Sequence, residues 1–282
     1  AAGKKAIAGA KTDAEKVRRL YEYVVKNTRY VGIELGIHGW KPFSAAEVNR
    51  RRYGDCKDKA TLLSALLRDN GVDATITLVR TADRGQLPPD HATMWAFNHA
   101  ITYVPGLDRF LDPTAEFNAA TELPVLDQGA MALVVHPDGQ VRLLNLPTST
   151  PADNLNASDY DATLSRDTRL VMEGKERFRG ARASELRQEL DEPEQRVRHL
   201  EEPLAQILPG VKVEDAEFSN LAALDEEVWY RYRFAVPRYG RTDGDRLSVP
   251  VALFRHQVAS AYAQLAHRST AWVAYTLHAE VN

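Results

Sequence analysis

The single cysteine of this 282-residue chain, Cys56, lies in the run Tyr-Gly-Asp-Cys-Lys-Asp-Lys, directly before an apolar helical pattern. Leucines recur on one face of that pattern, and Asn70-Gly71 is typical of a helix end. We therefore expect Cys56 in the first turn of a helix. Unpaired backbone N–H groups and the positive end of the helix dipole favour the thiolate there, which is the nucleophilic form of cysteine.

A thiolate nucleophile needs a base, and the base needs a group that orients it. His99 lies in a β-branched and aromatic stretch, residues 97–104, which predicts a strand ending at a turn. Residues 109–113 are expected to return as the second strand of a hairpin, with Asp112 near its end. A hairpin places His99 and Asp112 on neighbouring strands, where carboxylate and imidazole can meet. The ordered set Cys56, His99 and Asp112 is therefore the predicted catalytic site.

Each member of this set also has a structural interpretation. A lone cysteine is often an inert buried thiol, His99 could be a core histidine, and Asp112 could form a turn before a proline. His38, in a loop before Gly39-Trp40, is the main competitor as base. The histidines show no shared ligand spacing and there is no second cysteine, so we predict no metal site and no cofactor.

Three short segments resemble a known family: Tyr53 to Lys59, Phe97 to Ala100, and Leu111 to Thr114. They are similar to the transglutaminase-like superfamily, in particular to its bacterial branch of transglutaminase-like cysteine proteases in multidomain envelope proteins. The resemblance covers roughly residues 14–135 and implies a papain-like Cys-His-Asp triad on an α+β core. It also implies a location in a bacterial periplasm or cell envelope. The polar start of the sequence, Ala1 to Lys5, looks like the edge of a segment of a longer protein, so we expect the chain to be part of one.

An oxyanion intermediate needs hydrogen-bond donors, and the backbone N–H of Cys56 is a natural first one. The resemblance implies an aromatic or amide donor upstream of the cysteine, for which Tyr30 and Trp40 are candidates; both could instead be packing aromatics. Asn98 is another polar neighbour, but adjacent strand residues face opposite sides, so Asn98 should point away if His99 faces the cysteine. The charged residues after Cys56 fit a solvated helix start best.

Composition limits the partners. The net charge is −3 at pH 7, so the chain lacks the excess of basic residues that is typical of nucleic-acid-binding proteins. No apolar run is long enough for a membrane span, and one cysteine cannot form an internal disulfide. We therefore expect a peptide or protein substrate.

The order of elements predicts an α+β fold, with N-terminal helices packed on an antiparallel sheet. Capping boxes start helices at residues 12–27 and near 44–52, and the segments 74–79, 131–135 and 141–144 read as strands. The Pro- and Ser/Thr-rich segment 147–151 separates a transglutaminase-like catalytic domain, residues 1–146, from a β-rich accessory domain with helices and unknown role, residues 152–282.

In the accessory domain the pattern predicts one or two strands in 160–180 with Gly174 at a turn or bulge, and a helical segment over 181–208 with Val197 on its buried face. Further expected elements are strands at 211–218 and 228–236, a helix at 253–267 and a strand at 271–281.

The predicted function is cysteine-dependent acyl transfer on peptide or protein amides, through a thioester on Cys56. Peptide or amide hydrolysis is favoured because nothing in the sequence encodes a lysine-selecting tunnel. Protein-glutamine transamidation, which cross-links proteins, and a non-catalytic peptide-binding module on the same fold are the alternatives. There is no cluster of carboxylates like the calcium sites of animal transglutaminases.

Overall fold

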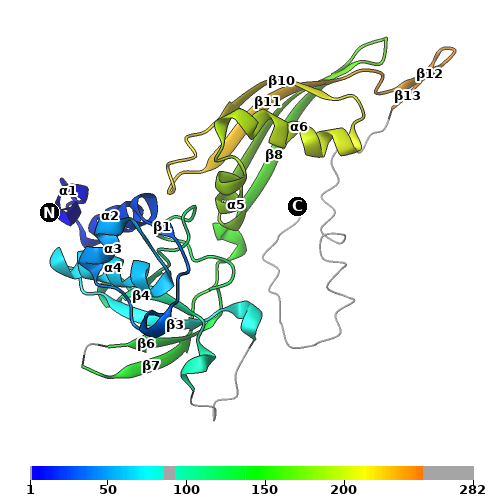
Figure 1. Ribbon diagram of the computed structural model, residues 1–282. Coiled ribbons are helices and arrows are strands. Elements are labelled where there is room, and N and C mark those ends of the chain that lie inside the picture. The colour runs from blue at the N-terminus through cyan, green and yellow to red at the C-terminus, as the bar shows by residue number, and fades with distance from the viewer. Residues whose placement is uncertain (1, 86–92, 137, 250–282) are drawn as a thin grey trace. The chain divides into compact units, whose positions relative to one another are not determined.

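The computed structural model describes residues 2–85, 93–136 and 138–249 (Figure 1). The chain divides into two compact units, Ala1–Thr150 and Pro151–Asn282, which are described separately below. Both units combine helices with antiparallel sheets. The prediction of an α+β fold is therefore confirmed.

The first unit begins with helices and continues as a sheet. Its helices are α1 (Ala2–Ala6), α2 (Asp13–Asn27), α3 (Ala45–Arg51) and α4 (Cys56–Asp69). Its strands are β1 (Arg29–Tyr30), β2 (Tyr53–Gly54), β3 (Thr75–Arg80), β4 (His99–Val104), β5 (Arg109–Leu111), β6 (Met131–Val135) and β7 (Val141–Asn145). The helix starts follow the capping signals of the sequence, because Thr12 and Ser44 each accept a hydrogen bond from the backbone N–H three residues later.

Five of these strands form one antiparallel sheet in the order β5-β4-β3-β6-β7. Alternate residues of the central strand β3 are buried, as its period-two pattern predicts. Val79, Ile101, Phe110 and Val134 belong to one buried cluster of this sheet. The hairpin of β4 and β5 has Thr102 opposite Leu111, so that Asp112 follows the last paired residue.

Helix α4 is the element that joins the helices to the sheet. It packs against β4, and α2 and α3 both pack against it (Figure 1). Thr102 of β4 donates a hydrogen bond to the carbonyl oxygen of Ala60 at 3.2 Å, and its hydroxyl lies 3.3 Å from that of Ser64. These buried polar contacts fix the first half of α4 on the strand that carries His99.

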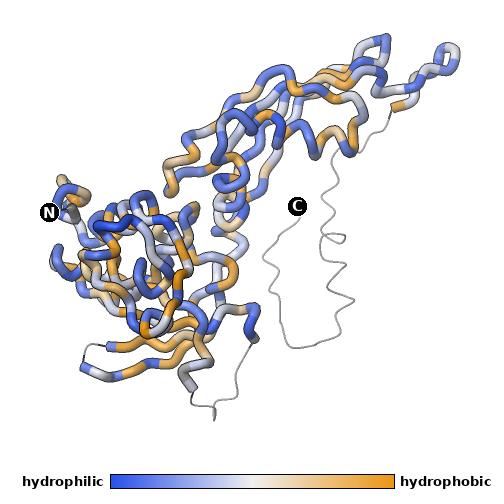
Figure 2. Tube along the Cα trace, viewed as in Figure 1, coloured by the Kyte–Doolittle hydropathy of each residue, from blue (hydrophilic) through white to orange (hydrophobic). Residues whose placement is uncertain are grey.

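The second unit is a four-stranded antiparallel sheet with two helices. The strands are β8 (Leu155–Leu164), β9 (Leu170–Arg179), β10 (Lys212–Phe218) and β11 (Val228–Val236), in the order β10-β11-β9-β8, and the helices are α5 (Ala181–Glu189) and α6 (Arg196–Ile207). Along β11, Tyr230, Tyr232 and Phe234 are buried, Trp229 is partly exposed, and Arg231 and Arg233 are exposed. Figure 2 colours the chain by hydropathy and shows hydrophilic and hydrophobic residues interspersed along the strands of this unit. A short hairpin, β12 (Arg241–Asp243) and β13 (Arg246–Ser248), follows.

The prediction for Gly174 is wrong. The turn between β8 and β9 lies at residues 165–169, and Gly174 is inside β9 opposite Tyr160. A Cβ atom at this position would come within 2.7 Å of the Tyr160 ring and 3.2 Å of the Tyr232 ring. Because Gly174 has no side chain, it leaves space for two aromatic rings, and the strand continues through it without a turn.

The helical segment predicted over 181–208 is interrupted. A short 3-10 helix at Pro193–Gln195 separates α5, which ends at Glu189, from α6. Val197 is 44% exposed, so it does not belong to the buried face that Leu200 and Leu204 form. The helix predicted at 253–267 and the strand predicted at 271–281 lie outside the described residues.

The described residues contain no helix that combines the length and the hydrophobicity needed to cross a bilayer.

Candidate active site

Cys56 is the first residue of α4, as the sequence predicts. Asp55 is the N-cap: its carboxylate accepts a hydrogen bond from the backbone N–H of Asp58, and the Asp58 carboxylate accepts one from that of Asp55. A Cβ atom at Gly54 would come within 2.6 Å of the Asp58 side chain, so only glycine fits before the cap. The segment from Gly54 to Asp58 therefore serves to hold Cys56 at a rigid helix start.

The expectation of a solvated helix start is wrong for Asp58. Its side chain is buried, and besides capping the helix it accepts hydrogen bonds from the backbone N–H of Phe43 at 2.8 Å and from the guanidinium of Arg51 at 2.5 Å. The same guanidinium lies over the Phe43 ring, 4.0 Å from its centre. Asp58 thus ties the start of α4 to the end of α3 and to the segment before it.

The expectation of a solvated helix start is also wrong for Lys59, because its side chain is 0% exposed. Its ammonium donates hydrogen bonds to the carbonyl oxygen of Thr28 at 2.5 Å and to the Glu116 carboxylate at 3.3 Å. Burial lowers the pKa of Lys59, and the negative charges of Glu116 and Asp112 oppose that effect. Glu116 also accepts from the backbone N–H of Tyr30, so Lys59 joins α4, β1 and the segment after Asp112.

His99 and Asp112 meet across the hairpin. Nε2 of His99 lies 3.1 Å from Oδ2 of Asp112, and both side chains are largely buried. The other carboxylate oxygen, Oδ1, accepts the backbone N–H of Thr114 at 2.8 Å and its hydroxyl at 2.7 Å. Since Nε2 is directed at Asp112, Nδ1 is the ring nitrogen left to face Cys56.

The charge state of His99 follows from these neighbours. Burial lowers the pKa of His99, but the Asp112 charge, its hydrogen bond and a hydrogen bond with Cys56 raise it, and the result lies well above the usual value. Burial raises the pKa of Asp112, yet the positive His99 and the two donors of Thr114 bring it below its usual value. Both shifts favour the ionised form of the pair, an imidazolium beside a carboxylate.

A second buried acid, Asp127, which the sequence did not point to, completes the cluster. One side-chain nitrogen or oxygen atom from each of His99, Asp112 and Asp127 lies within 4.8 Å of the other two. Burial and the Asp112 charge raise the pKa of Asp127 to about 7, while the positive His99 lowers it. Asp127 lies in the irregular segment before β6, where no spacing distinguishes it from a surface aspartate.

Tyr30 is beside the cysteine. The parallel pair β1–β2 has Tyr30 opposite Gly54, and the backbone N–H of Val31 donates to the Gly54 carbonyl at 2.9 Å. Burial raises the pKa of the Tyr30 phenol, and the neighbouring Cys56 and Asp55 raise it further. Its role as an oxyanion donor stays a prediction.

Asn98 and Trp40 are the other two residues that the sequence suggests as oxyanion donors, and they contact Thr81 and Trp95, respectively. The Asn98 side chain donates to the hydroxyl of Thr81 at 2.7 Å and accepts from its backbone N–H at 3.0 Å, so its amide is engaged in fixing the start of β4. Trp40 is 52% exposed and contacts the 80% exposed Trp95 edge to face, with ring centres 4.8 Å apart. An oxyanion role for either residue stays a prediction.

His38, the competing base, is engaged elsewhere. Its ring stacks on Phe43 with 3.6 Å between the centres, and its Nδ1 lies 2.9 Å from the carbonyl oxygen of Lys41. The structure thus brings Cys56 together with His99 and Asp112, and His38 has its own local contacts. The catalytic role of the three residues stays a prediction.

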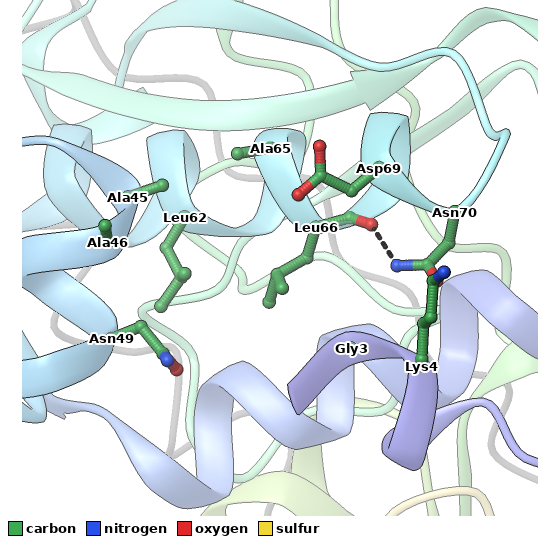
Figure 3. Close-up of a pocket in the computed structure, with 10 residues that line it drawn as sticks. All are labelled: Gly3, Lys4, Ala45, Ala46, Asn49, Leu62, Ala65, Leu66, Asp69 and Asn70. Carbon is green, nitrogen blue, oxygen red and sulfur yellow. Dashed lines mark hydrogen bonds between the residues drawn. The ribbon is translucent and has the colours of Figure 1, made fainter. Parts of the chain in front are cut away.

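A pocket of about 400 Å³ lies elsewhere in the first unit, between α1, α3 and α4 (Figure 3). Small side chains such as Ala45, Ala46 and Ala65 line it, and Lys4 and Asp69 stand at its side. It contains none of the residues of the cysteine–histidine site.

The family model described as the transglutaminase-like superfamily matches residues 1–105, a range that includes Cys56 and His99 and ends before Asp112. A solved structure, a candidate protease from Parabacteroides distasonis ATCC 8503, is 11% identical, with a TM-score of 0.41; the match covers 88% of this chain and 49% of the other. The chain thus spans about half the length of that protein. No curated protein matches the chain.

Proposed function

We propose that the chain is a cysteine-dependent acyl-transfer enzyme, because residues 1–105 match the model of the transglutaminase-like superfamily and because of the geometry around Cys56. Its substrates would be peptide or protein amides, and hydrolysis would be the main reaction. The observation that carries the proposal is the hydrogen bond between His99 and Asp112, with Cys56 near enough to His99 to help raise its pKa.

In the proposed mechanism the Cys56 sulfur attacks the carbonyl carbon of an amide, and the carbonyl oxygen becomes an oxyanion. The backbone N–H of Cys56, at the first position of α4, is available to this oxyanion because the first N–H groups of a helix have no acceptor within the helix. The His99 imidazolium donates its proton to the departing amine, so that the C–N bond breaks and a thioester remains on Cys56.

The second half of the reaction restores the enzyme. Neutral His99 takes a proton from water, the resulting hydroxide equivalent attacks the thioester carbonyl, and the carboxylic acid leaves as the sulfur recovers its electron pair. Asp112 keeps the imidazole oriented and stabilises its charge in both halves. An amine in place of water would give transamidation with the same residues.

A peptide-cleavage assay with matched variants tests the proposal. The full chain would be incubated with a mixture of peptides that contain internal and side-chain amides, and the products would be identified by mass spectrometry. Cys56→Ala and His99→Ala should abolish the products, whereas His38→Ala, which alters a histidine with only local contacts, should retain them.

The products also separate the reaction types. New carboxylic acids indicate hydrolysis, whereas products joined to an added primary amine indicate transamidation. Products that persist in Cys56→Ala would refute the proposal. The location in a bacterial envelope, expected from the resemblance, and the role of the second unit stay predictions.

A further inference from the structure

Asp127 is held rigidly beside the His99–Asp112 pair. Its backbone N–H donates to the carbonyl oxygen of Pro124 at 2.9 Å, and its own carbonyl accepts from Ala130 at 3.1 Å. The residue is 2% exposed, and no group among the described residues donates a hydrogen bond to its completely buried Oδ2. A buried carboxylate oxygen without a partner is costly, so this site needs a compensating proton or cation.

No basic side chain in the described part of the chain supplies that compensation by an ion pair with Asp127. The groups that face it are Asp112, which follows β5, and His99 on β4, which in turn faces Cys56 on α4. Arg80, at the end of the strand next to β6, instead directs its guanidinium to backbone carbonyl oxygens.

The two carboxyl groups are not equivalent. Asp112 accepts hydrogen bonds from Thr114 and pairs with His99, so its ionised form is well stabilised. Within the described ranges, no comparable donors reach the Asp127 carboxyl group. When two carboxyl groups share a site, one of them takes up a proton, and here the proton belongs on Asp127. A protonated Asp127 can donate a hydrogen bond to Asp112, and this satisfies both groups.

We propose that Asp127 is a positioning residue of this site: its protonated carboxyl group donates a hydrogen bond to Asp112 and thereby fixes the carboxylate that orients His99. This inference deepens the proposed function and rests on it. Loss of the Asp127 proton removes the hydrogen bond and adds a second negative charge beside the imidazolium. The raised pKa of Asp127, about 7, puts that change close to neutral pH.

Histidine titration by NMR tests the proposal on the full chain without any substrate. The Cε1–H signal of His99, assigned with His99→Gln, would be followed between pH 5 and pH 10. In the wild type, the signal should show an additional inflection near pH 7, when Asp127 ionises.

Asp127→Asn keeps the shape and a permanent donor toward Asp112, but it cannot ionise. In this variant the inflection near pH 7 should disappear, and His99 should lose its proton at a lower pH than in the wild type, because one negative charge is missing. Asp108→Asn is the matched control, since this aspartate of the β4–β5 turn binds the Tyr103 hydroxyl and should leave the titration unchanged.

Identical His99 titrations in the wild type and Asp127→Asn would overturn the proposal. A wild-type titration that changes when EDTA is added would also overturn it, since a metal ion rather than a proton would then join the two carboxyl groups. Cleavage of peptides plays no part in this measurement. A chain that shows the predicted titration but no peptide cleavage would therefore refute the proposed function, while the hydrogen bond from Asp127 to Asp112 would still hold.

Discussion

Asp112→Asn is expected to convert His99 from an imidazolium into a neutral imidazole, because of how Thr114 engages the carboxylate. The backbone N–H and hydroxyl of Thr114 both donate to Oδ1, so an asparagine should place its amide oxygen there. Its NH2 group then lies at the position of Oδ2, opposite Nε2 of His99. A donor facing this nitrogen is compatible only with the unprotonated ring.

The magnitude follows from the bond that is lost. A hydrogen bond to a charged group contributes about 1.5–3 kcal/mol, which corresponds to a roughly 10- to 150-fold change in an equilibrium. The affinity of His99 for its proton should fall by this factor, and the rate of Cys56 alkylation at about pH 6 should fall with it. At about pH 9 an ordinary thiol is ionised without help, so the difference should vanish there.

Alkylation by iodoacetamide measures this directly, because only the thiolate reacts at an appreciable rate. Cys56 is the only cysteine, so the extent of modification can be read from the intact mass. Asp108→Asn is again the matched control and should alkylate like the wild type. Equal rates for Asp112→Asn and the wild type at pH 6 would refute the reasoning that Asp112 holds the proton on His99.

Two further predictions concern stability. Lys59→Met should lower the free energy of unfolding by about 1–3 kcal/mol in a urea titration, because two oxygen partners lose their buried donor. Lys16→Met, at an exposed ion pair, is the control and should change the free energy of unfolding by less than about 1 kcal/mol. Equal effects of the two substitutions would contradict the structural role of Lys59. Gly174→Ala should destabilise the second unit by about 1–3 kcal/mol, because its methyl group would overlap Tyr160. Gly106→Ala, whose methyl group would meet no atom within 4 Å, is the control, and a Gly174→Ala protein that melts like it would exclude the predicted overlap.

The fold was predictable wherever local patterns act alone. The capping box at Thr12, the alternation in β3 and the β4–β5 hairpin are all set by residues close together in the sequence, and the structure has these elements where the patterns put them. The hairpin is also why a histidine and an aspartate thirteen residues apart could be expected to meet.

Contacts between distant segments could not be predicted in this way. Lys59 follows a helix start, where charged residues are usually solvated, and only the folded chain brings it to Thr28 and Glu116, 31 and 57 residues away. No sequence pattern predicts that Asp127 belongs to the site, because its neighbours in the site come from β4 and from the end of β5.

Gly174 shows the same limit within a strand. A glycine among strand residues indicates either a turn or bulge or a place where neighbouring side chains come close to the backbone. Only the residues on the adjacent strands decide between these two interpretations. Here Tyr160 on β8 and Tyr232 on β11 both need the space. Their hydroxyls donate to the Glu176 carboxylate, each at 2.7 Å, a network that local sequence does not encode.

The most direct test of the central claim is to trap the acyl-enzyme. The full chain would be mixed with a peptide that it cleaves, quenched with acid, and analysed by intact-mass and peptide-mapping mass spectrometry. The account predicts a thioester on Cys56 whose mass equals the acyl part of the substrate, which hydroxylamine removes and which fails to form in His99→Ala. Cleavage that proceeds without any adduct on Cys56, or an adduct that forms equally well without His99, would contradict it.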